Sequence, residues 1–485
     1  MIDPFSSATE IAAAIRLHRF SASDVLDLYF ERIKKHNPVL NAICTLDEAG
    51  ARARAREADA ALARGELWGP LHGVPMTIKD ALETAGVRTT GGYPPLSGHV
   101  PKKDATAVAR LKAAGAVLIG KTNVPPLSAD GRADNPIFGR TNNPWNLERT
   151  PGGSTGGGAA AVAAGLSAFD VGSDLAASVR VPAHWCGLFG LKPTEGRVPN
   201  TGHIPELPGT PHALRHMNTL GPLARSVEDL AAILKVIAGP DDRDWETAPA
   251  PLQDVPAPFL CSLKFSWCTQ FAGESPSRET AQAITALMKK LADLGAEVEN
   301  RSPAGFSFED AWETWGEVVI AERVVTQGDA ARERVEKLHA SLGDLPVARG
   351  AARGARASVA DYMVALTRRD RLITALEAFF AGCDAWLCPV AYGPAIGHVP
   401  FGTPVDVDER KVPYFLATTA FTCPFNLTGH PAVVLPLAIT KEGLPIGVQV
   451  LGRRWSEPAL LALAKQLSLV TGPFRPPPAF ISGAL

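Results

Sequence analysis

The segment PGGSTGGGAAAVAAGLSAFDVGSDLAASVRVPAHWCGLFGLKP, residues 151–193, has a composition that ordinary core packing does not require. Five of the seven residues from Gly152 to Gly158 are glycines. Glycine permits positive φ angles and lets other groups approach the backbone closely. Two hydroxyl residues, Ser154 and Thr155, lie inside this cluster, and the run AAAVAAGLSAF follows it. These small residues predict a tightly packed, buried helix.

The second half of the segment places Ser178 between Asp174 and Arg180. Two serines, Ser154 and Ser178, thus stand at opposite ends of a small-residue run, which suggests one site built from both ends. A serine hydroxyl is a poor nucleophile until a neighbouring base takes its proton. Asp174 and Arg180 are interpreted as an ion pair that supports this loop.

The candidate base is Lys79, which ends the apolar run VPMTI in LHGVPMTIKD. This run predicts a buried strand. Burial penalises the charged form of a lysine and lowers its pKa, and only the neutral amine can act as a base. His72, His184 and Cys186 are interpreted as packed core residues instead.

Several motifs together resemble the amidase signature family of serine hydrolases. They occur in the family's order between residues 69 and 452 and are GPLHGVPMTIKD, GKTNVP, NNPWN, PGGSTGG, SDLAASVRVPA, CGLFGLKPTEGRV, NLTGHPAVVLPL and GLPIGVQVLG. The resemblance implies Ser178 as the nucleophile, Ser154 as a bridging serine after a cis peptide bond, and Lys79 as the base. It also implies a fold with a large mixed β-sheet covered on both faces by helices.

The chemistry implied by this resemblance is hydrolysis of a carboxylic amide through an acyl-enzyme, with no metal and no cofactor. The developing oxyanion is expected to meet the backbone N–H groups of Leu175, Ala176, Ala177 and Ser178. Thr155, Asp174 and Arg180 are expected to support the site. Carbamate (urethane) or ester hydrolysis is a close alternative, because the acyl-enzyme chemistry is shared.

The chain departs from the family pattern at two places. Ala176 and Ala177 stand where the family commonly has two glycines, which puts substrate size and rate in question. An alternative of another class is the amidotransferase subunit of a tRNA-charging complex. That subfamily usually has Gln after the arginine that follows the nucleophile, where this chain has Val181. An inactive scaffold is disfavoured because all three triad positions are intact.

Two further motifs are formal matches only. Residues 115–122, GAVLIGKT, satisfy the P-loop pattern, but the apolar run is itself a predicted strand and two prolines follow it. Residues 152–156, GGSTG, satisfy the nucleophile elbow of α/β-hydrolases, which requires a preceding strand. The preceding residues, NNPWNLERTP, are instead predicted to form a loop. The elbow would make Ser154 the nucleophile and leave Lys79 unexplained.

Length, charge and cysteine pattern indicate the number of domains, the kind of partner and the location of the protein. The 485 residues and the spread of the motifs indicate one catalytic domain with a sizeable core. The net charge of −2 gives no reason to expect nucleic acid or an anionic membrane as a partner. The seven cysteines lack a C-x-x-C pair, and the N-terminus lacks a signal-peptide pattern, so we expect a cytoplasmic protein. The substrate is expected to be a small molecule, and a homodimer is the assembly that the family resemblance implies.

The segments around the motifs complete the prediction. Residues 1–65 are expected to be mainly helical, with capping boxes at Ser7 and Ser21. Residues from about 300 to 415 match the family weakly and are expected to form a variable region that selects the substrate. Its aromatic residues are interpreted as core, and the loop from Gly393 to Tyr414 as a contributor to selection. The aromatic residues are Phe306, Phe308, Trp312 and Trp315.

Overall fold

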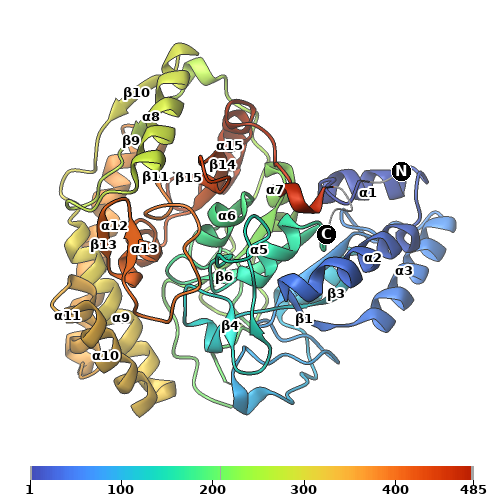
Figure 1. Ribbon diagram of the computed structural model, residues 1–485, viewed down its shortest axis with the longest axis horizontal. Helices are drawn as coiled ribbons and strands as arrows, with labels where there is room; N and C mark the ends of the chain where they lie inside the picture. The colour runs from blue at the N-terminus through green and yellow to red at the C-terminus, as the bar shows by residue number, and fades with distance from the viewer. Residues whose placement is uncertain (1–2, 208, 482–485) are drawn as a thin grey trace.

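The computed structural model describes residues 3–207 and 209–481, and its central element is a large mixed β-sheet (Figure 1). Within the described residues this sheet has 11 strands, in the spatial order β1 (Ile43–Leu46), β3 (Val117–Thr122), β2 (Pro75–Lys79), β6 (Phe169–Asp174), β8 (Thr219–Ala224), β7 (Phe189–Lys192), β14 (Ala432–Ile439), β15 (Pro445–Leu451), β11 (Ala385–Pro389), β9 (Lys264–Trp267) and β10 (Glu297–Asn300). The predicted α/β fold with a large mixed sheet is confirmed.

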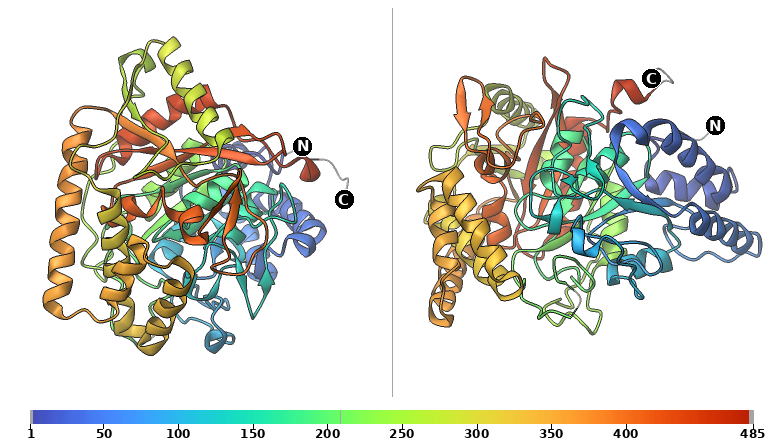
Figure 2. Two further views of the ribbon diagram at one scale, coloured as in Figure 1. Left: turned by 60° about the vertical axis from the view of Figure 1, so that its left-hand side comes forward. Right: turned by 60° about the horizontal axis from the view of Figure 1, so that its bottom comes forward.

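Helices cover both faces of this sheet (Figure 2). The helices are α1 (Ala8–Arg16), α2 (Ala22–Leu40), α3 (Glu48–Ala63), α4 (Thr106–Ala113), α5 (Gly156–Ala163), α6 (Arg180–Cys186), α7 (Val227–Ile237), α8 (Arg278–Asp293), α9 (Phe308–Gln327), α10 (Asp329–Leu342), α11 (Pro346–Gly354), α12 (Val359–Phe380), α13 (Tyr414–Thr419), α14 (Cys423–Leu427) and α15 (Glu457–Thr471). Two small hairpins pair β4 (Asp134–Asn135) with β5 (Gly139–Arg140), and β12 (Val405–Val407) with β13 (Arg410–Val412). Among the described helices, none combines the length and apolar character that a membrane span needs.

Helices α5 and α6 pack against each other over the middle of the sheet, and α7 and α15 form the corresponding pair on the opposite face. Helix α5 is built only from Gly, Ala and Val, and it is fully buried. A Cβ at Gly157 would overlap the backbone of Asn123, and one at Gly158 would overlap the carboxylate of Asp170. The glycine cluster of the sequence therefore lets this helix lie against the strands that carry the candidate site.

The N-terminal elements agree with their sequence signals. Helices α1 and α2 begin with complete capping boxes, Ser7 with Glu10 and Ser21 with Asp24. In each box the serine hydroxyl accepts the N3 amide, and the N3 carboxylate accepts the serine amide. The predicted strands near the C-terminus are also present, as β14 and β15.

Helices α9 to α12 form a layer beside the sheet, at lower left in Figure 1. Helices α9 and α11 approach each other closely through three glycines. A Cβ at Gly350 or Gly354 would overlap a backbone carbonyl of α9, and one at Gly316 would overlap the Val347 carbonyl of α11. We refer to residues 308–380 as the helical layer.

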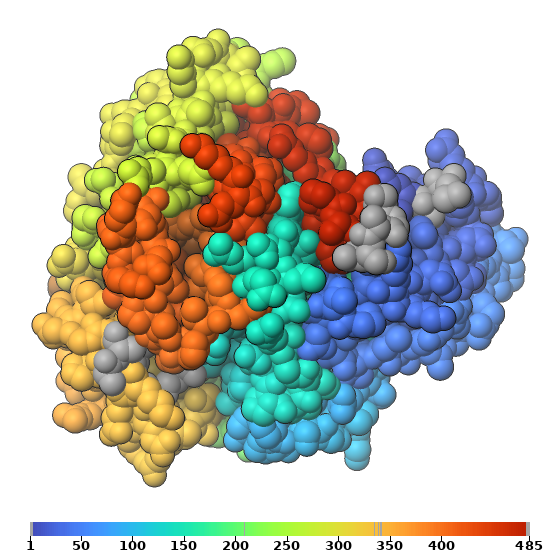
Figure 3. Space-filling model, viewed as in Figure 1, coloured from blue at the N-terminus to red at the C-terminus, as the bar shows by residue number. Residues whose placement is uncertain are grey.

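The segment around α13 joins this layer to the centre of the molecule. In the space-filling view, residues near 400–420 lie directly beside residues near 130–160 (Figure 3). Two hydrogen bonds connect these segments: the Tyr414 hydroxyl donates to Asp130 at 2.7 Å, and the Arg132 guanidinium donates to the Val399 carbonyl at 2.7 Å.

Candidate active site

Strands β2 and β6 bring their last residues to the same edge of the sheet. The two strands are parallel neighbours, with Ile78 opposite Val171. Lys79 ends β2, and Ser173 and Asp174 end β6. In open α/β sheets this carboxyl edge is where ligands bind. The predicted base and the start of the loop that carries Ser178 therefore meet at one place.

The Lys79 side chain is fully buried and makes three polar contacts. Its Nζ lies 2.7 Å from Ser154 Oγ, 2.9 Å from Ser173 Oγ and 3.4 Å from the Ser173 carbonyl oxygen. Burial lowers the pKa of Lys79 to about 7, although Asp174 and Asp170 act in the opposite direction. A substantial fraction of neutral amine is therefore present near neutral pH.

Ser154 and Ser178 lie next to each other through the backbone. The peptide bond from Gly153 to Ser154 is cis, as the family resemblance implies. The N–H of Thr155 donates to the Ser178 carbonyl at 3.1 Å. Ser154 is fully buried, whereas Ser178 is partly exposed and lines a cavity. A substrate in the cavity can therefore reach Ser178, while Ser154 lies behind it in contact with Lys79.

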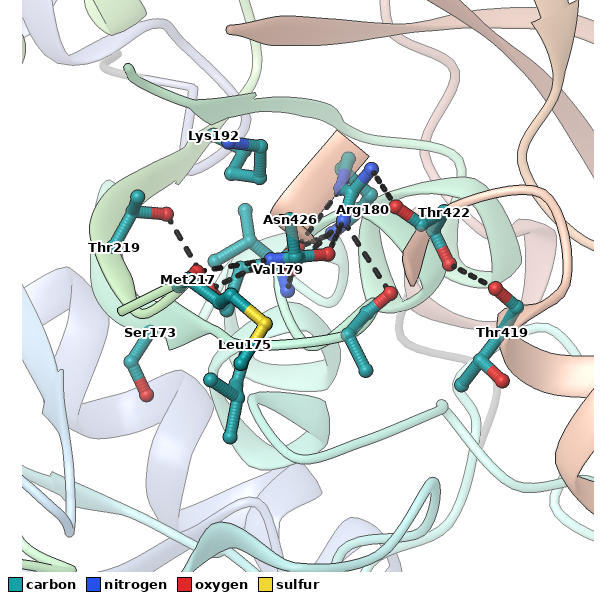
Figure 4. Close-up of polar contacts among 12 residues, drawn as sticks. Ser173, Leu175, Val179, Arg180, Lys192, Met217, Thr219, Thr419, Thr422 and Asn426 are labelled. Atoms are coloured by element: carbon teal, nitrogen blue, oxygen red, sulfur yellow. Dashed lines mark hydrogen bonds and ion pairs between the residues drawn. The ribbon is translucent and has the colours of Figure 1, made fainter. Parts of the chain in front are cut away.

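Asp174 and Arg180 form a fully buried ion pair that fixes the loop between β6 and α6. The guanidinium donates two hydrogen bonds to the carboxylate, at 3.0 and 2.9 Å, and also bonds Asn426 (Figure 4). The same carboxylate accepts the backbone N–H of Val179 at 3.0 Å. Arg180 holds the pKa of Asp174 well below its usual range despite burial. The ion pair expected from the sequence is present, and its contacts with the loop agree with a supporting role.

The loop between these charged residues forms part of the cavity wall. Leu175, Ala176, Ala177 and Ser178 all line the cavity. Two of their carbonyl oxygens are occupied by hydrogen bonds within the protein. Trp315 Nε1 donates to the Leu175 carbonyl at 3.0 Å, and Arg180 donates to the Ala176 carbonyl at 3.4 Å. Among the described residues, no acceptor is found for the four N–H groups. The loop is thus suited to binding an oxyanion.

The cavity measures about 870 Å³, part of it open to solvent, and its wall is mostly apolar. One side is the loop containing Ser178, together with Gly153. The facing side comes from α9, α11 and α13, and its side chains include Trp315, Val319, Ile320, Ala351 and Phe415. The rings of Trp315 and Phe415 lie 5.4 Å apart between centroids.

The charged residues on the cavity wall are Asp130 and Arg323. Asp130 is already bound, since its carboxylate accepts hydrogen bonds from Arg132 at 2.8 and 2.6 Å and from the Tyr414 hydroxyl at 2.7 Å. Asp130 is thus already paired within the protein, and most of the remaining wall is apolar.

The structure brings every predicted site residue to the sheet edge beside this cavity. These residues are Lys79, Ser154, Thr155, Asp174, Leu175, Ala176, Ala177, Ser178 and Arg180. The aromatic residues predicted to be core have two roles. Phe306, Phe308 and Trp312 lie in the core, whereas Trp315 is in both the core and the cavity wall. From the loop between Gly393 and Tyr414, Phe401 and Tyr414 reach the cavity.

Sequence reasoning missed several residues at the site. Ser173 contacts Lys79 directly, and His203 contacts Ser173 at 2.9 Å. Residues Ser128 to Gly131, and Phe415, Thr418 and Thr419, also line the cavity. The position of Ser173 at the end of a strand beside β2 was the available signal, but the sequence carried none for His203.

The motifs judged to be formal matches also have clear positions. Lys121 of the P-loop-like run is a buried residue of β3, and its amine donates to Thr84 Oγ1 at 2.8 Å. It therefore faces protein groups.

In the described part of the chain, His212, Asp244 and Glu246 have donor atoms close enough together for a metal ion, but they lie outside the cavity. His212 is also paired with Glu206 at 2.5 Å.

Comparisons with known proteins agree with this arrangement. The chain is 35% identical over 481 residues to a glutamyl-tRNA(Gln) amidotransferase subunit from Roseiflexus sp. (strain RS-1), covering 94% of this chain and 95% of the relative. A solved structure of 6-aminohexanoate cyclic dimer hydrolase superposes with a TM-score of 0.81 at 29% identity, covering 99% and 100% of the two chains. A bacterial aryl acylamidase superposes with a TM-score of 0.80 at 26% identity, covering 96% of each chain.

The family model described as Amidase matches residues 24–461, which is most of the chain and includes every residue of the site described above. The solved neighbours share both the sheet and its helical cover, and the aryl acylamidase is itself described as an amidase signature enzyme. The chain belongs to the amidase signature family.

Proposed function

We propose that the protein hydrolyses the C–N bond of carboxylic amides through an acyl-enzyme formed on Ser178. The observation that carries this proposal is the 2.7 Å contact between Lys79 Nζ and Ser154 Oγ, buried behind a Ser178 that lines the cavity. With its pKa lowered to about 7, Lys79 can accept a proton near neutral pH, which a general base must do.

The proposed reaction uses these groups in turn. Ser178 Oγ attacks the carbonyl carbon and gives its proton to Ser154, whose own proton passes to Lys79. The electron pair of the C=O bond moves onto oxygen, where the N–H groups of residues 175–178 stabilise it. The C–N bond then breaks, and the leaving amine takes a proton back through the same relay. Water repeats the sequence on the ester and releases the acid.

The cavity favours substrates with an apolar group next to the scissile amide. Trp315, Val319, Ile320 and Phe415 supply aromatic and aliphatic surface opposite Ser178. Burial of such a group stabilises the complex by about 25 cal/mol per Å² of apolar area. The likeness to an aryl acylamidase supports this substrate class. Carbamates and esters with the same apolar group are expected to enter the same cavity, because the attacking group and the relay do not change.

The test is hydrolysis of aryl amides, a primary amide and an aryl carbamate by the purified protein. Ser178→Ala, Ser154→Ala and Lys79→Ala are assayed alongside. Ser167→Ala is the matched control, since this buried serine lies in the same segment but its hydroxyl donates to the Phe169 carbonyl at 2.7 Å. We expect turnover by the parent protein and by Ser167→Ala, and none by Ser178→Ala. Full activity of folded Ser178→Ala would reject the proposal.

The curated relatives favour a second candidate function, that of an amidotransferase component. The relative from Roseiflexus carries that name at 35% identity over 94% of this chain. Amide cleavage at Ser178 would be shared, but the amide would be glutamine and the ammonia would pass to another acceptor. Two features weigh against it: Val181 replaces the usual Gln of that subfamily, and Asp130 on the cavity wall is already paired, which leaves it poorly suited to bind an amino group.

Ammonia release from glutamine separates the two candidates. Equal concentrations of glutamine and an aryl amide are offered to the purified chain, and ammonia and arylamine are quantified. Preference for the aryl amide supports hydrolysis of apolar amides. Release of ammonia from glutamine, with no release of arylamine, would instead establish the amidotransferase function.

A further inference from the structure

A second hydrogen-bonded chain, separate from Ser154, reaches Lys79 through Ser173. Ser173 Oγ lies 2.9 Å from Lys79 Nζ and 2.9 Å from His203 Nε2. The other ring nitrogen, Nδ1, lies 3.3 Å from Nδ2 of Asn218. All four residues, from Lys79 to Asn218, are buried. This arm joins the base to the loop that follows β7.

The loop that carries His203 is fastened to the chain just after Lys79. The Ile204 N–H donates to the Ala81 carbonyl at 2.7 Å, and His203 and Leu82 form an isolated β-bridge. The Leu82 N–H donates in turn to the Lys79 carbonyl at 3.0 Å. The imidazole is therefore placed relative to Lys79 by backbone contacts, independently of the Ser173 hydroxyl.

The hydrogen bonds of neutral Lys79 determine which way the Ser173 hydroxyl must point. A neutral amine has two N–H donors and one lone pair, and the lone pair must face Ser154 Oγ if Lys79 is to take its proton. The two donors must then go to Ser173 Oγ and the Ser173 carbonyl. Since Ser173 Oγ accepts from Lys79, its own proton needs another acceptor, and His203 Nε2 is the group in position.

The opposite proton arrangement would disable the base. If His203 carried a proton on Nε2, it would donate to Ser173 Oγ, and the Ser173 hydroxyl would turn its proton toward the Lys79 lone pair. That lone pair would then be occupied and could not accept from Ser154. The direction of the hydrogen bond between Ser173 and His203 thus decides whether Lys79 can act.

We propose that His203 is a positioning residue: as the Nδ1–H tautomer it accepts the Ser173 hydroxyl proton at Nε2, and this keeps the Lys79 lone pair directed at Ser154. The inference rests on the proposed Ser178 amidase reaction and assigns a further residue to it.

Two asparagines can support this tautomer. In the structure, Asn218 Nδ2 donates to Asn200 Oδ1 at 2.6 Å and lies 3.3 Å from His203 Nδ1. A side-chain amide can be turned over with almost no change of shape, and the proposed tautomer requires this of both asparagines. The Asn218 oxygen then accepts from His203 Nδ1–H and from the Asn200 amide, so both contacts remain with their directions reversed.

The charges around the arm keep the imidazole neutral. Burial, with Lys79 and Arg323 as the nearby cations, lowers the pKa of His203 to about 3. The acids that face Lys79 are Asp170 and Asp174 on β6. Burial raises the pKa of Asp170 to about 7, whereas Asp174 is held ionised by Arg180. The tautomer of His203, rather than its charge, is therefore what matters across the working pH range.

The test compares His203→Leu with His203→Gln in the full chain, using an aryl amide that the parent protein hydrolyses. Leucine fills the site but accepts no proton, whereas the Gln side-chain oxygen can replace Nε2 as acceptor. For His203→Leu we expect kcat to fall at least about tenfold, the equivalent of one net hydrogen bond, with KM little changed. His203→Gln should recover most of this loss.

The pH profile supplies a readout that a merely structural role would not move. In His203→Leu the Ser173 hydroxyl donates to the neutral amine, which favours the uncharged form of Lys79. The acid limb of kcat/KM should therefore move to lower pH while the plateau falls. Ser173→Ala removes the hydroxyl that would occupy the lone pair, so its plateau should fall less than that of His203→Leu. The double variant Ser173→Ala/His203→Leu should lose no more than Ser173→Ala alone.

The outcomes separate this inference from the proposed function. Thermal unfolding checks that each variant is folded, and His203→Asn, whose shorter side chain does not place an acceptor at Ser173 Oγ, replaces His203→Leu if that variant is unfolded. An unchanged plateau and acid limb in His203→Leu, an equal loss in His203→Gln, or additive losses in the double variant would each overturn the role of His203. If the parent protein has no activity that depends on Ser178, the proposed function itself has failed.

Discussion

The cluster at the sheet edge and the helical layer that faces it are built in opposite ways. At the sheet edge, Lys79, Ser154 and the pair of Asp174 with Arg180 are fully buried, and their side chains are held by polar contacts. Across the cavity, the helical layer offers apolar side chains such as Val319 and Ile320. The chemistry is thus fixed by hydrogen bonds, while the shape offered to the substrate is fixed by packing.

The way each region is stabilised also differs. In the helical layer, Glu313 and Glu317 of α9 pair with Arg349, Arg353 and Arg368. The pairs of Glu313 with Arg349 and Arg353 are partly exposed on both sides, so each contributes little, about 0–1 kcal/mol. The ion pair at the sheet edge is excluded from water. We expect changes at the edge to abolish activity or folding and changes in the layer to alter substrate preference.

The largest effect is expected from Lys79→Met, which removes the base but keeps an apolar stem of similar length. We expect kcat/KM for an aryl amide to fall by about 10³-fold or more, as for other members of catalytic triads. The acid limb near pH 7 should disappear with it, because the parent rate rises as Lys79 loses its proton. Steady-state rates across the neutral pH range measure both.

Lys121→Met is the matched control, since Lys121 is equally buried on the neighbouring strand β3 but contacts Leu82, Thr84 and Thr89. Its folded fraction should keep the parent pH profile. Near-parent activity in folded Lys79→Met would mean that the base has been wrongly assigned.

The next effect concerns stability. Asp174→Asn leaves the buried Arg180 without its carboxylate, and removal of one partner of a buried pair costs about 3–5 kcal/mol. The free energy of unfolding from urea denaturation measures this cost. Asp104→Asn disturbs a partly exposed pair with Lys112 and should cost about 1 kcal/mol or less. Equal costs for the two variants would show that burial does not distinguish these regions.

A smaller effect is expected where α9 and α11 touch. Gly350→Ala places a methyl group against the Glu313 carbonyl and should lower the free energy of unfolding by about 1–3 kcal/mol. Because Ala351 lines the cavity, KM should rise more than kcat falls. Gly98→Ala, at an exposed position with open space around it, is the control and should change neither quantity. A Gly350→Ala protein as stable as the parent would contradict the close packing.

The smallest effects should appear at the boundary between the regions. Trp315→Phe keeps an aromatic ring in the cavity wall but loses the hydrogen bond to the Leu175 carbonyl. One such bond contributes about 0.5–1.5 kcal/mol, so kcat should fall about two- to tenfold. Ala176→Gly widens the same loop and should change the relative kcat/KM across a panel of aryl amides. Unchanged ratios for Ala176→Gly would show that the alanine methyl does not select the substrate.

The sequence predicted the sheet edge far better than the helical layer. Lys79, Ser154 and Ser178 lie in motifs whose residue types and order are specific, and VPMTI is a plain strand signal. The contact of Ser173 with His203 joins positions 30 residues apart in sequence, and no local pattern indicates it.

The cavity wall was only partly predictable for a physical reason. Its residues come from α9, α11, α13 and the loop at Asp130, and apolar residues at helical spacing look the same whether they face a core or a cavity. Trp315 was interpreted as core because of this ambiguity, yet it also lines the cavity. The close contact at Gly350 depends on how α9 and α11 cross, and the sequence of either helix alone does not predict this crossing.

The most direct test of the central claim is to trap the acyl-enzyme. The protein is mixed with an aryl ester that carries the preferred acyl group, quenched in acid within the first turnovers, and analysed by mass spectrometry of the intact chain and its peptides. We predict one acyl group, located on Ser178 and absent from Ser178→Ala. An acyl group on Ser154, or steady turnover by Ser178→Ala, would contradict the account.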